Sequence, residues 1–471
     1  MRIFAKAFYL IGFLVWTNQA MAAPPTTPAF DIVFTGFNTT TLDLSWTNGN
    51  GARRIVVAKQ GGDPDANPVN NSGSYVANAA FGSGTQLGTG NFIVFNGTGN
   101  TVSVTGLSPN IVYHFKVFEY NGTGFADAEY LTSNGTDNPN SRSTLASVPS
   151  NQPTSLLFSN PLNDGTGYTL TWTASAGGAD GYIVVRRQGA SPNGPAPADG
   201  TGYIVGQDID PGADVEIVEF VGAATTFNLS GLLANTNYFF DVYAFNGSGA
   251  AVNYLTGTGP LEGNRQTLQL EPSTQATNIS FNTLNTTSYT ITWMIGNGAN
   301  RIVVIDDAAI AFTPSEATNY TTNVNYTAGT DLGGGQKCVF NGNGNSVSVT
   351  NLTPNTVYHV RVFEYNGSGE SQNYNTTTST DNPSSRTTLA SQPASAASSI
   401  QFSNITQTSF DLNFTNGDGS SRLVVLKQGS AVDSNPVDGS VYTANATFGN
   451  GSQLGTGNYV VGIGSGPFSI S

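Results

Sequence analysis

The chain has 471 residues, enough for about three domains of ordinary size, and its 38% hydrophobic content is too high for a disordered protein. Only 10% of the residues are charged, the formal net charge is −14 and there are 16 basic residues in all, which excludes the basic clusters that nucleic-acid binding needs. A single cysteine excludes an intramolecular disulfide, so packed cores have to supply the stability.

The first residues have the pattern of a secretory signal peptide. A basic start precedes an apolar run at residues 8–16, and small residues before Ala23 mark a cleavage site. The run is too short to span a bilayer, and no later stretch has the roughly 20 apolar residues that a span requires. We therefore expect residues 1–22 to be removed, which leaves a secreted or cell-surface chain without a membrane span.

A strand-like segment that ends in an aromatic residue occurs four times. The segments end at Trp46, Trp172, Trp293 and Phe414, separated by 126, 121 and 121 positions. A period of this length corresponds to a whole domain rather than to one turn of a solenoid. We call the four copies the first to fourth repeats.

Each repeat contains the same series of strand signals in the same order. In the first, residues 41–46 alternate polar and apolar side chains, as a half-buried strand does, and residues 53–61 form a continuous β-branched run typical of a strand covered on both faces. A second alternating pair of apolar residues then leads to Leu107 and, six residues later, to Tyr113. Tyr113 begins the predicted sixth strand, "YHFKVFEYNG", whose first, third and fifth side chains should point inward.

The spacing of leucine and tyrosine carries a resemblance to a known family. Leu352, Pro354, Thr356 and Tyr358 complete an L-x-P-x-T-x-Y motif, and the other two copies match it in part. Together with a tryptophan in an early strand, this motif resembles the fibronectin type III module, an immunoglobulin-like sandwich of two β-sheets, in the form found in secreted bacterial proteins of the Bacteroidota type. The resemblance implies an all-β fold and a tyrosine whose hydroxyl reaches back to the backbone near the leucine. The structural residues that it implies are Trp46, Tyr113, Trp172, Tyr238, Trp293 and Tyr358.

The repeats are longer than a module of this kind, and the excess lies between the third and fifth strands. In each repeat a proline there precedes a tyrosine by six or seven positions, as Pro68 precedes Tyr75. A free loop does not need an aromatic residue at a held spacing, so we predict an ordered insertion that packs on the sandwich. Its glycine-rich stretch, as in "FGSGTQLG", should cross one sheet edge closely.

These patterns predict a domain organisation. A fourth copy of the tyrosine motif does not occur before Ser471, so the last repeat is expected to be truncated and the sequence to be a fragment. The predicted segments are a signal peptide at 1–22, fibronectin type III-like repeats at 23–146, 147–269 and 270–390, and a truncated repeat at 391–471.

The residues with reactive side chains do not form a catalytic pattern. His114 and His359 occupy the same position in two repeats, but the second repeat has Phe239 there, which favours surface filling over acid-base chemistry. The glycine stretches lack the G-K-[ST] of a phosphate-binding loop. Cys338 aligns with Ile93, as a buried small apolar residue would. We therefore expect neither an enzyme nor a cofactor.

Two binding hypotheses remain. Alternating carboxylates at Asp208, Asp210 and Asp214 are a candidate calcium site. Six aromatic residues lie out of phase with the inward set and are candidates for a sugar-stacking or partner-binding face; the favoured alternative is that the insertion covers them in a second core that includes Tyr75 and Phe81. The six residues are Phe118, Tyr120, Tyr243, Phe245, Phe363 and Tyr365.

The sequence favours a non-catalytic, exported array of modules that acts as a spacer or in adhesion, with surface polysaccharide or protein as candidate partners. The alternative is an accessory or carbohydrate-binding region of a larger secreted hydrolase, whose catalytic domain would follow residue 471. The fold by itself does not separate them, because β-sandwiches host many functions.

Overall fold

The structure is a computed structural model that describes residues 22–123, 127–212 and 214–471. The predicted signal peptide lies outside these ranges except for residue 22. Within them every regular element is a β-strand or a short 3-10 helix, and no helix has the length and apolar composition needed to cross a bilayer. Contacts divide the chain into two compact units, one of residues 1–160, 168–229 and 237–265 and one of residues 161–167, 230–236 and 266–471.

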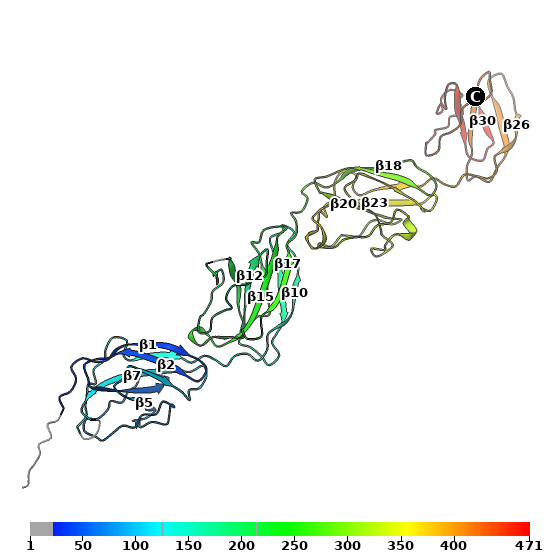
Figure 1. The fold of residues 1–471 in the computed structure, drawn as a ribbon. Helices are drawn as coiled ribbons and strands as arrows, with labels where there is room; N and C mark the ends of the chain where they lie inside the picture. The colour runs from blue at the N-terminus through cyan, green and yellow to red at the C-terminus, as the bar shows by residue number, and fades with distance from the viewer. Residues whose placement is uncertain (1–21, 124–126, 213) are drawn as a thin grey trace, which may run out of the picture. The chain divides into compact units, whose positions relative to one another are not determined.

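In the first unit, the first repeat is a sandwich of a smaller and a larger sheet (Figure 1). The smaller sheet has the order β1-β2-β6, and the larger has the order β4-β5-β3-β7-β8, with β9 also paired to β7. The strands are β1 (Phe30–Phe37), β2 (Leu42–Thr47), β3 (Arg53–Gln60), β4 (Gln86–Leu87), β5 (Asn91–Gly97), β6 (Thr101–Val104), β7 (Val112–Asn121), β8 (Glu129–Tyr130) and β9 (Asn140–Ser143).

The second repeat follows the same plan in the same unit. Its smaller sheet has the order β10-β11-β14, and its larger sheet the order β13-β12-β15-β16, with β17 paired to β15. The elements are β10 (Thr154–Ser159), β11 (Tyr168–Thr173), β12 (Gly181–Gln188), β13 (Glu216–Gly222), β14 (Thr226–Leu229), β15 (Asn237–Asn246), η1 (Gly249–Ala251), β16 (Asn253–Tyr254) and β17 (Leu261–Gln266).

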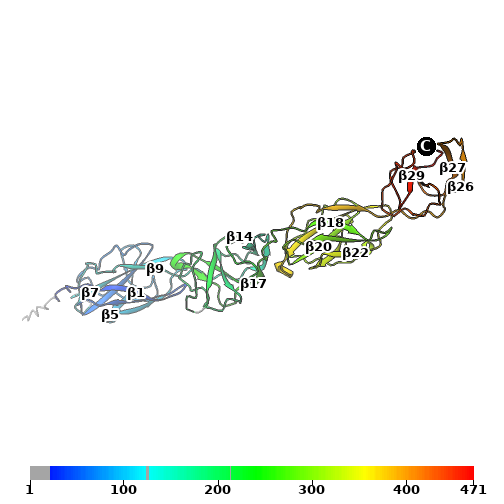
Figure 2. The ribbon, with the colours of Figure 1, turned by 90° about the horizontal axis from the view of Figure 1, so that it is seen from above.

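The second unit contains the third repeat, with sheets of order β18-β19-β22 and β21-β20-β23-β24 and with β25 paired to β23 (Figure 2). Its elements are β18 (Thr277–Asn282), β19 (Tyr289–Met294), β20 (Asn300–Asp306), η2 (Tyr326–Ala328), β21 (Lys337–Gly342), β22 (Ser346–Val349), β23 (Val357–Asn366), η3 (Gly369–Ser371), β24 (Asn373–Tyr374) and β25 (Ser384–Thr387).

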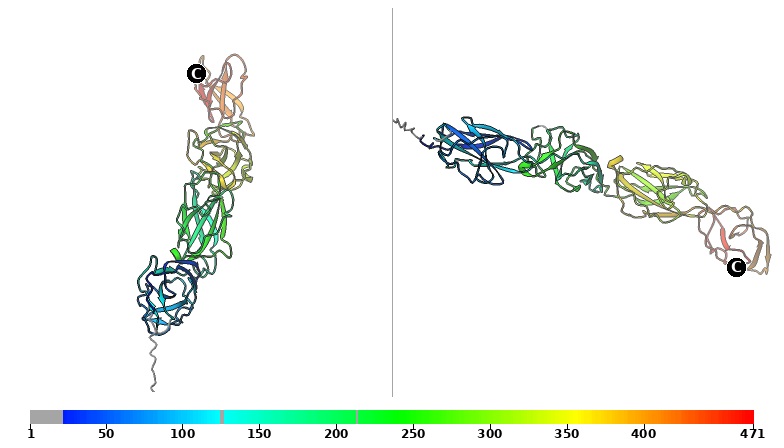
Figure 3. Two further views of the ribbon diagram at one scale, coloured as in Figure 1. Left: turned by 60° about the vertical axis from the view of Figure 1, so that its left-hand side comes forward. Right: turned by 90° about the horizontal axis from the view of Figure 1, so that it is seen from below.

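The fourth repeat, at the orange to red end of the ribbon in Figure 3, belongs to the same unit. It forms a sheet of order β26-β27-β30 and a pair β28-β29. Its strands are β26 (Ser398–Ser403), β27 (Phe410–Thr415), β28 (Leu423–Lys427), β29 (Asn458–Ile463) and β30 (Phe468–Ile470).

The inner core of each sandwich, between its two sheets, follows the alternation in the sequence. In β2 the side chains of Leu42, Leu44 and Trp46 are buried while their neighbours are partly exposed, and β3 is buried over five consecutive residues because it is covered on both faces. On β7, Tyr113 and Phe115 join the same inner core, as the phase of the strand predicts. The all-β sandwich fold is thus confirmed.

The predicted tyrosine corner is seen, for example, in the first and third repeats. The Tyr113 hydroxyl accepts a hydrogen bond of 3.0 Å from the Ser108 N–H, and Tyr358 accepts one of 2.9 Å from the Thr353 N–H. Both donors directly follow the motif leucine, so the hydroxyl satisfies a backbone group at a turn. Tyr238 of the second repeat is buried at the equivalent position.

Candidate functional site

The larger sheet of each of the first three repeats carries a second core on its outer face, which we call the outer core. In the first repeat it is built from the β3, β5 and β7 side chains that point away from the inner core, together with Tyr130 and, partly buried, Tyr75. The second and third repeats contain equivalent clusters.

The six aromatic residues proposed as a binding face belong to this outer core. Each of them is at most 9% exposed, because the insertion and the β7–β9 connection, or its equivalent, cover the sheet. The sugar-stacking hypothesis is therefore wrong for Phe118, Tyr120, Tyr243, Phe245, Phe363 and Tyr365. A buried ring presents no face on which a sugar can stack.

One recurring hydrogen bond orders the insertion. In all four repeats the tyrosine that follows the proline accepts a hydrogen bond from the backbone N–H of the residue directly after that proline, so its hydroxyl closes a short loop of chain. The pairs are Val69 N to Tyr75 at 2.9 Å, Ala198 N to Tyr203 at 3.0 Å, Ser315 N to Tyr320 at 2.8 Å and Val437 N to Tyr442 at 2.8 Å. The held spacing in the sequence is the signature of this loop.

A polar side chain at or next to the start of the strand that follows the insertion (β5, β13, β21 or β29) provides a second anchor. Its oxygen accepts backbone N–H groups of the insertion in every repeat, at donor–acceptor distances of 2.7–3.3 Å. The acceptors are Asn91, Glu216, Gln336 and Asn458. The glycine-rich crossing is also present, because a Cβ on Gly84 would lie 2.0 Å from the Ile93 carbonyl oxygen.

Sequence reasoning missed the third component of the outer core. Tyr130 comes from β8, in the connection between β7 and β9, and its ring lies 5.8 Å from that of Tyr75 and 4.8 Å from that of Tyr120. Tyr254 and Tyr374 take the same place in the next two repeats. This component could have been recognised in the sequence, because each of the three repeats has a tyrosine nine or ten positions after the last aromatic residue of the sixth strand.

One expected member of the outer core lies elsewhere. Phe81 packs in the inner core, where its ring lies 5.0 Å from that of Tyr113, and Tyr326 contacts Tyr358 in the same way in the third repeat. The prediction for Phe81 was wrong because the insertion covers both the outer face of the sheet and the open end of the sandwich.

A buried ion pair links the two central strands of the larger sheet. Arg54 and Glu119 are 4% and 0% exposed, and the guanidinium donates to both carboxylate oxygens at 3.2 and 3.1 Å. Arg301 and Glu364 repeat the arrangement. Glu119 also accepts the Gly49 N–H at 2.9 Å, so the pair satisfies a backbone donor as well.

The second repeat replaces both partners of that pair together. Tyr182 and Ala244 face each other at the register position of the arginine and the glutamate. The Tyr182 hydroxyl accepts the N–H of Ser175 at 2.9 Å, and Ser175 is the residue equivalent to Gly49. The joint replacement thus removes both charges and keeps the backbone hydrogen bond, which agrees with the high cost of a lone buried charge.

Two of the three aspartates proposed as calcium ligands have protein partners. Asp214 pairs with Arg187, and one Asp208 oxygen accepts the N–H groups of Asp210 and Glu216, each at 3.1 Å. Among the described residues no three histidine, cysteine or acidic side chains gather as metal ligands would. The geometry gives the calcium hypothesis no support.

The two histidines lie on equivalent strand positions, and the cysteine lies in a core. His114 Nδ1 lies 2.7 Å from an Asp63 oxygen on a partly exposed position of β7, and His359 stands opposite Asp306 on β20. Cys338 is fully buried in the outer core of the third repeat, and its burial raises the pKa of the thiol to about 12. Cys338 pairs with Val304 as Ile93 pairs with Val57, which confirms the alignment of the two positions.

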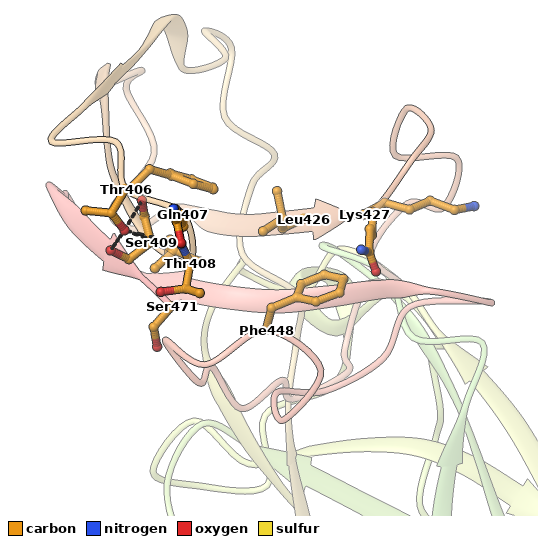
Figure 4. A pocket seen from close by; sticks show the side chains of 11 residues that line it. Thr406, Gln407, Thr408, Ser409, Leu426, Lys427, Phe448 and Ser471 are labelled. Atoms are coloured by element: carbon orange, nitrogen blue, oxygen red, sulfur yellow. Dashed lines mark hydrogen bonds between the residues drawn. The ribbon is translucent and has the colours of Figure 1, made fainter.

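The fourth repeat has a cavity of about 330 Å³, whose lining is mixed. Phe448 lies on one side of it, and Thr406 and Ser409 bond to each other at one end (Figure 4). Phe448 corresponds to Phe81, whose ring in the first repeat packs on a tyrosine of the sixth strand. The position of Phe448 therefore assigns the apolar part of the lining to the interior of the sandwich.

Two family matches fall on single sandwiches. Residues 151–254 match the Fibronectin type III domain family, and residues 274–378 match the family described as Purple acid Phosphatase, N-terminal domain. The two ranges cover equivalent elements, β10 to β16 and β18 to β24. No curated protein matches the sequence.

Several solved structures of tandem domains are similar at low identity. The chicken CNTN1 FN1-FN3 domains are 16% identical, with a TM-score of 0.28 over 78% of this chain and 100% of that one. A two-domain fibronectin type III segment from chicken tenascin is 19% identical, with a TM-score of 0.20 over 48% and 99%. The central Fibronectin-III array of RIM-binding protein is 10% identical, with a TM-score of 0.15 over 56% and 79%. TM-scores of this size imply nothing about a shared partner.

Proposed function

We propose that this tandem array of fibronectin type III-like sandwiches is an exported, non-catalytic spacer or adhesion region of a bacterial surface protein. The observation that carries the proposal is the outer core. It buries the aromatic residues of the larger sheet in each of the first three repeats, so that each of these repeats is a closed block. Such blocks hold other parts of a protein apart without chemistry of their own.

The outer face of the smaller sheet supports the same function. Short polar side chains pair there across strands, as Thr169 does with Asn228 at 2.8 Å and Thr290 with Ser348 at 2.9 Å. The paired hydroxyl and amide groups make part of this face polar, and Val33 and Leu157 are exposed on it as single apolar side chains, which do not form a large patch for unspecific association.

The test uses residues 23–471 as one chain. We expect no hydrolysis of p-nitrophenyl phosphate or of aryl glycosides, with or without added divalent metals. In cells that display the chain through a C-terminal anchor with an N-terminal epitope, deletion of residues 270–390 should leave the remaining repeats folded and bring the epitope closer to the surface. Hydrolysis above a buffer control, or an epitope at unchanged distance after the deletion, would overturn the proposal, whereas saturable binding of one glycan by the second and third repeats would identify adhesion as the role.

The second candidate is an accessory region of a larger secreted hydrolase. The match of residues 274–378 to a family named for a phosphatase favours it. That match falls on a sandwich equivalent to the fibronectin type III domain at 151–254, so it brings no catalytic residues with it. Sequencing of the gene past the codon for Ser471 tests this candidate, because a following domain with clustered carboxylates or histidines would supply the missing chemistry.

A further inference from the structure

One position in the larger sheet has opposite charge in different repeats. Lys116 and Arg361 lie on the outer face of the sixth strand in the first and third repeats, and Asp241 takes their register position on β15. The lysine Nζ lies 4.6 Å from the centre of the Phe118 ring, and the arginine lies 4.4 Å from that of Phe363.

In the first and third repeats the charged group of this side chain is bound by groups of its own repeat. Lys116 Nζ donates to the Thr132 carbonyl at 3.4 Å, and Arg361 donates to the Thr376 carbonyl at 2.5 Å. The location thus suits an ammonium or guanidinium group, with a ring below it and a carbonyl beside it.

The second repeat lacks that cation and has a cavity beside the aspartate. The cavity has a volume of about 250 Å³ and is lined from β15 and β17. These two strands are paired and are labelled in Figure 1. Asp241 and the half-buried ring of Phe239 line it from β15, Glu262 and Asn264 line it from β17, and Ser191 lines it from the insertion. It therefore combines carboxylates, an amide and an aromatic side chain at one place.

Asp241 is 6% exposed, and no ion pair between described residues involves it. Its side-chain partner is the hydroxyl of Tyr243, which carries no charge. Two nearby carboxylates, Glu262 and Glu216, oppose ionisation of Asp241 by charge repulsion. Arg187 lies next to this cluster, 3.9 Å from a Glu216 oxygen, and donates to the Ser191 carbonyl. Burial, reinforced by these carboxylates, raises the pKa of Asp241 to about 7.

We propose that this cavity of the second repeat binds an organic cation, an ammonium or guanidinium head group such as a lysine or arginine side chain of a partner protein. The cation pairs with Asp241, which holds the register position of Lys116 and Arg361. Asp241 supplies the counter-charge, Glu262 a second carboxylate and Phe239 an aromatic surface. We expect no such binding in the other complete repeats, because a lysine or an arginine stands there in place of Asp241.

The test is a titration of residues 23–471 with Nα-acetyl-argininamide, followed by ¹³C NMR of carboxyl-labelled aspartate. The Asp241 signal is assigned by its absence in the Asp241→Asn variant. Saturable shifts of that signal are expected, with a dissociation constant in the millimolar range and a lower apparent pKa of Asp241. The uncharged isostere Nα-acetyl-citrullinamide and an equal concentration of NaCl should leave the signal unchanged.

Two variants separate binding from folding. Asp241→Lys restores the residue type of the first repeat and should abolish binding with a native circular dichroism spectrum, and Glu262→Gln should weaken binding about tenfold or less. With these variants, binding is read from amide shifts of the second repeat. Equal affinity in Asp241→Lys, a response to NaCl that matches the response to the arginine derivative, or no saturable shift at 50 mM probe would each overturn the proposal.

Discussion

The buried ion pair of the third repeat allows a test of how the larger sheet is stabilised. Glu364→Ala removes both hydrogen bonds of the carboxylate to Arg301 and leaves the Gly296 N–H, which donates to Glu364 at 3.0 Å, without its acceptor. The guanidinium, 3% exposed, keeps its carbonyl acceptors but loses its counter-charge. We expect a loss of about 3–5 kcal/mol in the free energy of unfolding, as for other buried pairs broken on one side.

The second repeat supplies the matched control. Arg301→Tyr combined with Glu364→Ala reproduces the Tyr182 and Ala244 pair, and the new hydroxyl should accept the orphaned N–H. The double variant should therefore lie within about 1–2 kcal/mol of the parent, although it carries one substitution more than Glu364→Ala.

Urea unfolding followed by tryptophan fluorescence measures both variants. In the exported chain Trp293 becomes the only tryptophan after Trp46→Phe and Trp172→Phe, and the fourth repeat already has Phe414 at this position. These changes remove no hydrogen bond, because the indole N–H groups have no partner. The reasoning is refuted if Glu364→Ala lowers the free energy of unfolding by less than about 1 kcal/mol, or if the double variant is no more stable than the single Glu364→Ala variant.

Three further predictions concern single residues. The folded state holds a proton on Asp241 that the unfolded state loses near pH 4, so the stability of the second repeat should fall by about 1–2 kcal/mol as pH rises from about 4 to 7. Asp241→Asn should abolish that fall in urea unfolding followed by Trp172 fluorescence; an equal fall in the variant would contradict this origin. Tyr320→Phe should cost about 1 kcal/mol and speed hydrogen exchange at the Ser315 N–H, whereas an unchanged exchange rate would show that the loop does not depend on this hydroxyl. Cys338 should react with a thiol reagent only on unfolding, since its thiol is fully buried; rapid reaction of the native chain would show that the outer core opens.

The sequence by itself determined that the chain is made of repeats, that each repeat is a β-sandwich and that the insertion is an ordered segment. Alternation in residues 41–46 specifies one buried face because side chains of a strand alternate with a period of two. The distance from Pro68 to Tyr75 indicates a closed loop because the contact is local, and a local contact leaves a similar spacing, of six or seven positions, in every copy.

Only the tertiary structure decided which distant residues share a cluster. Tyr130 meets Tyr75 across 55 positions, and Arg54 meets Glu119 across 65, so neither contact leaves a local pattern. The strand register brings these groups together, and the exchange of arginine and glutamate for Tyr182 and Ala244 is visible as one event only when that register is known. The tertiary structure also decided that the aromatic residues proposed for binding are buried. A side chain on the outer face of a sheet is exposed only if no other segment packs on it, and here the insertion does.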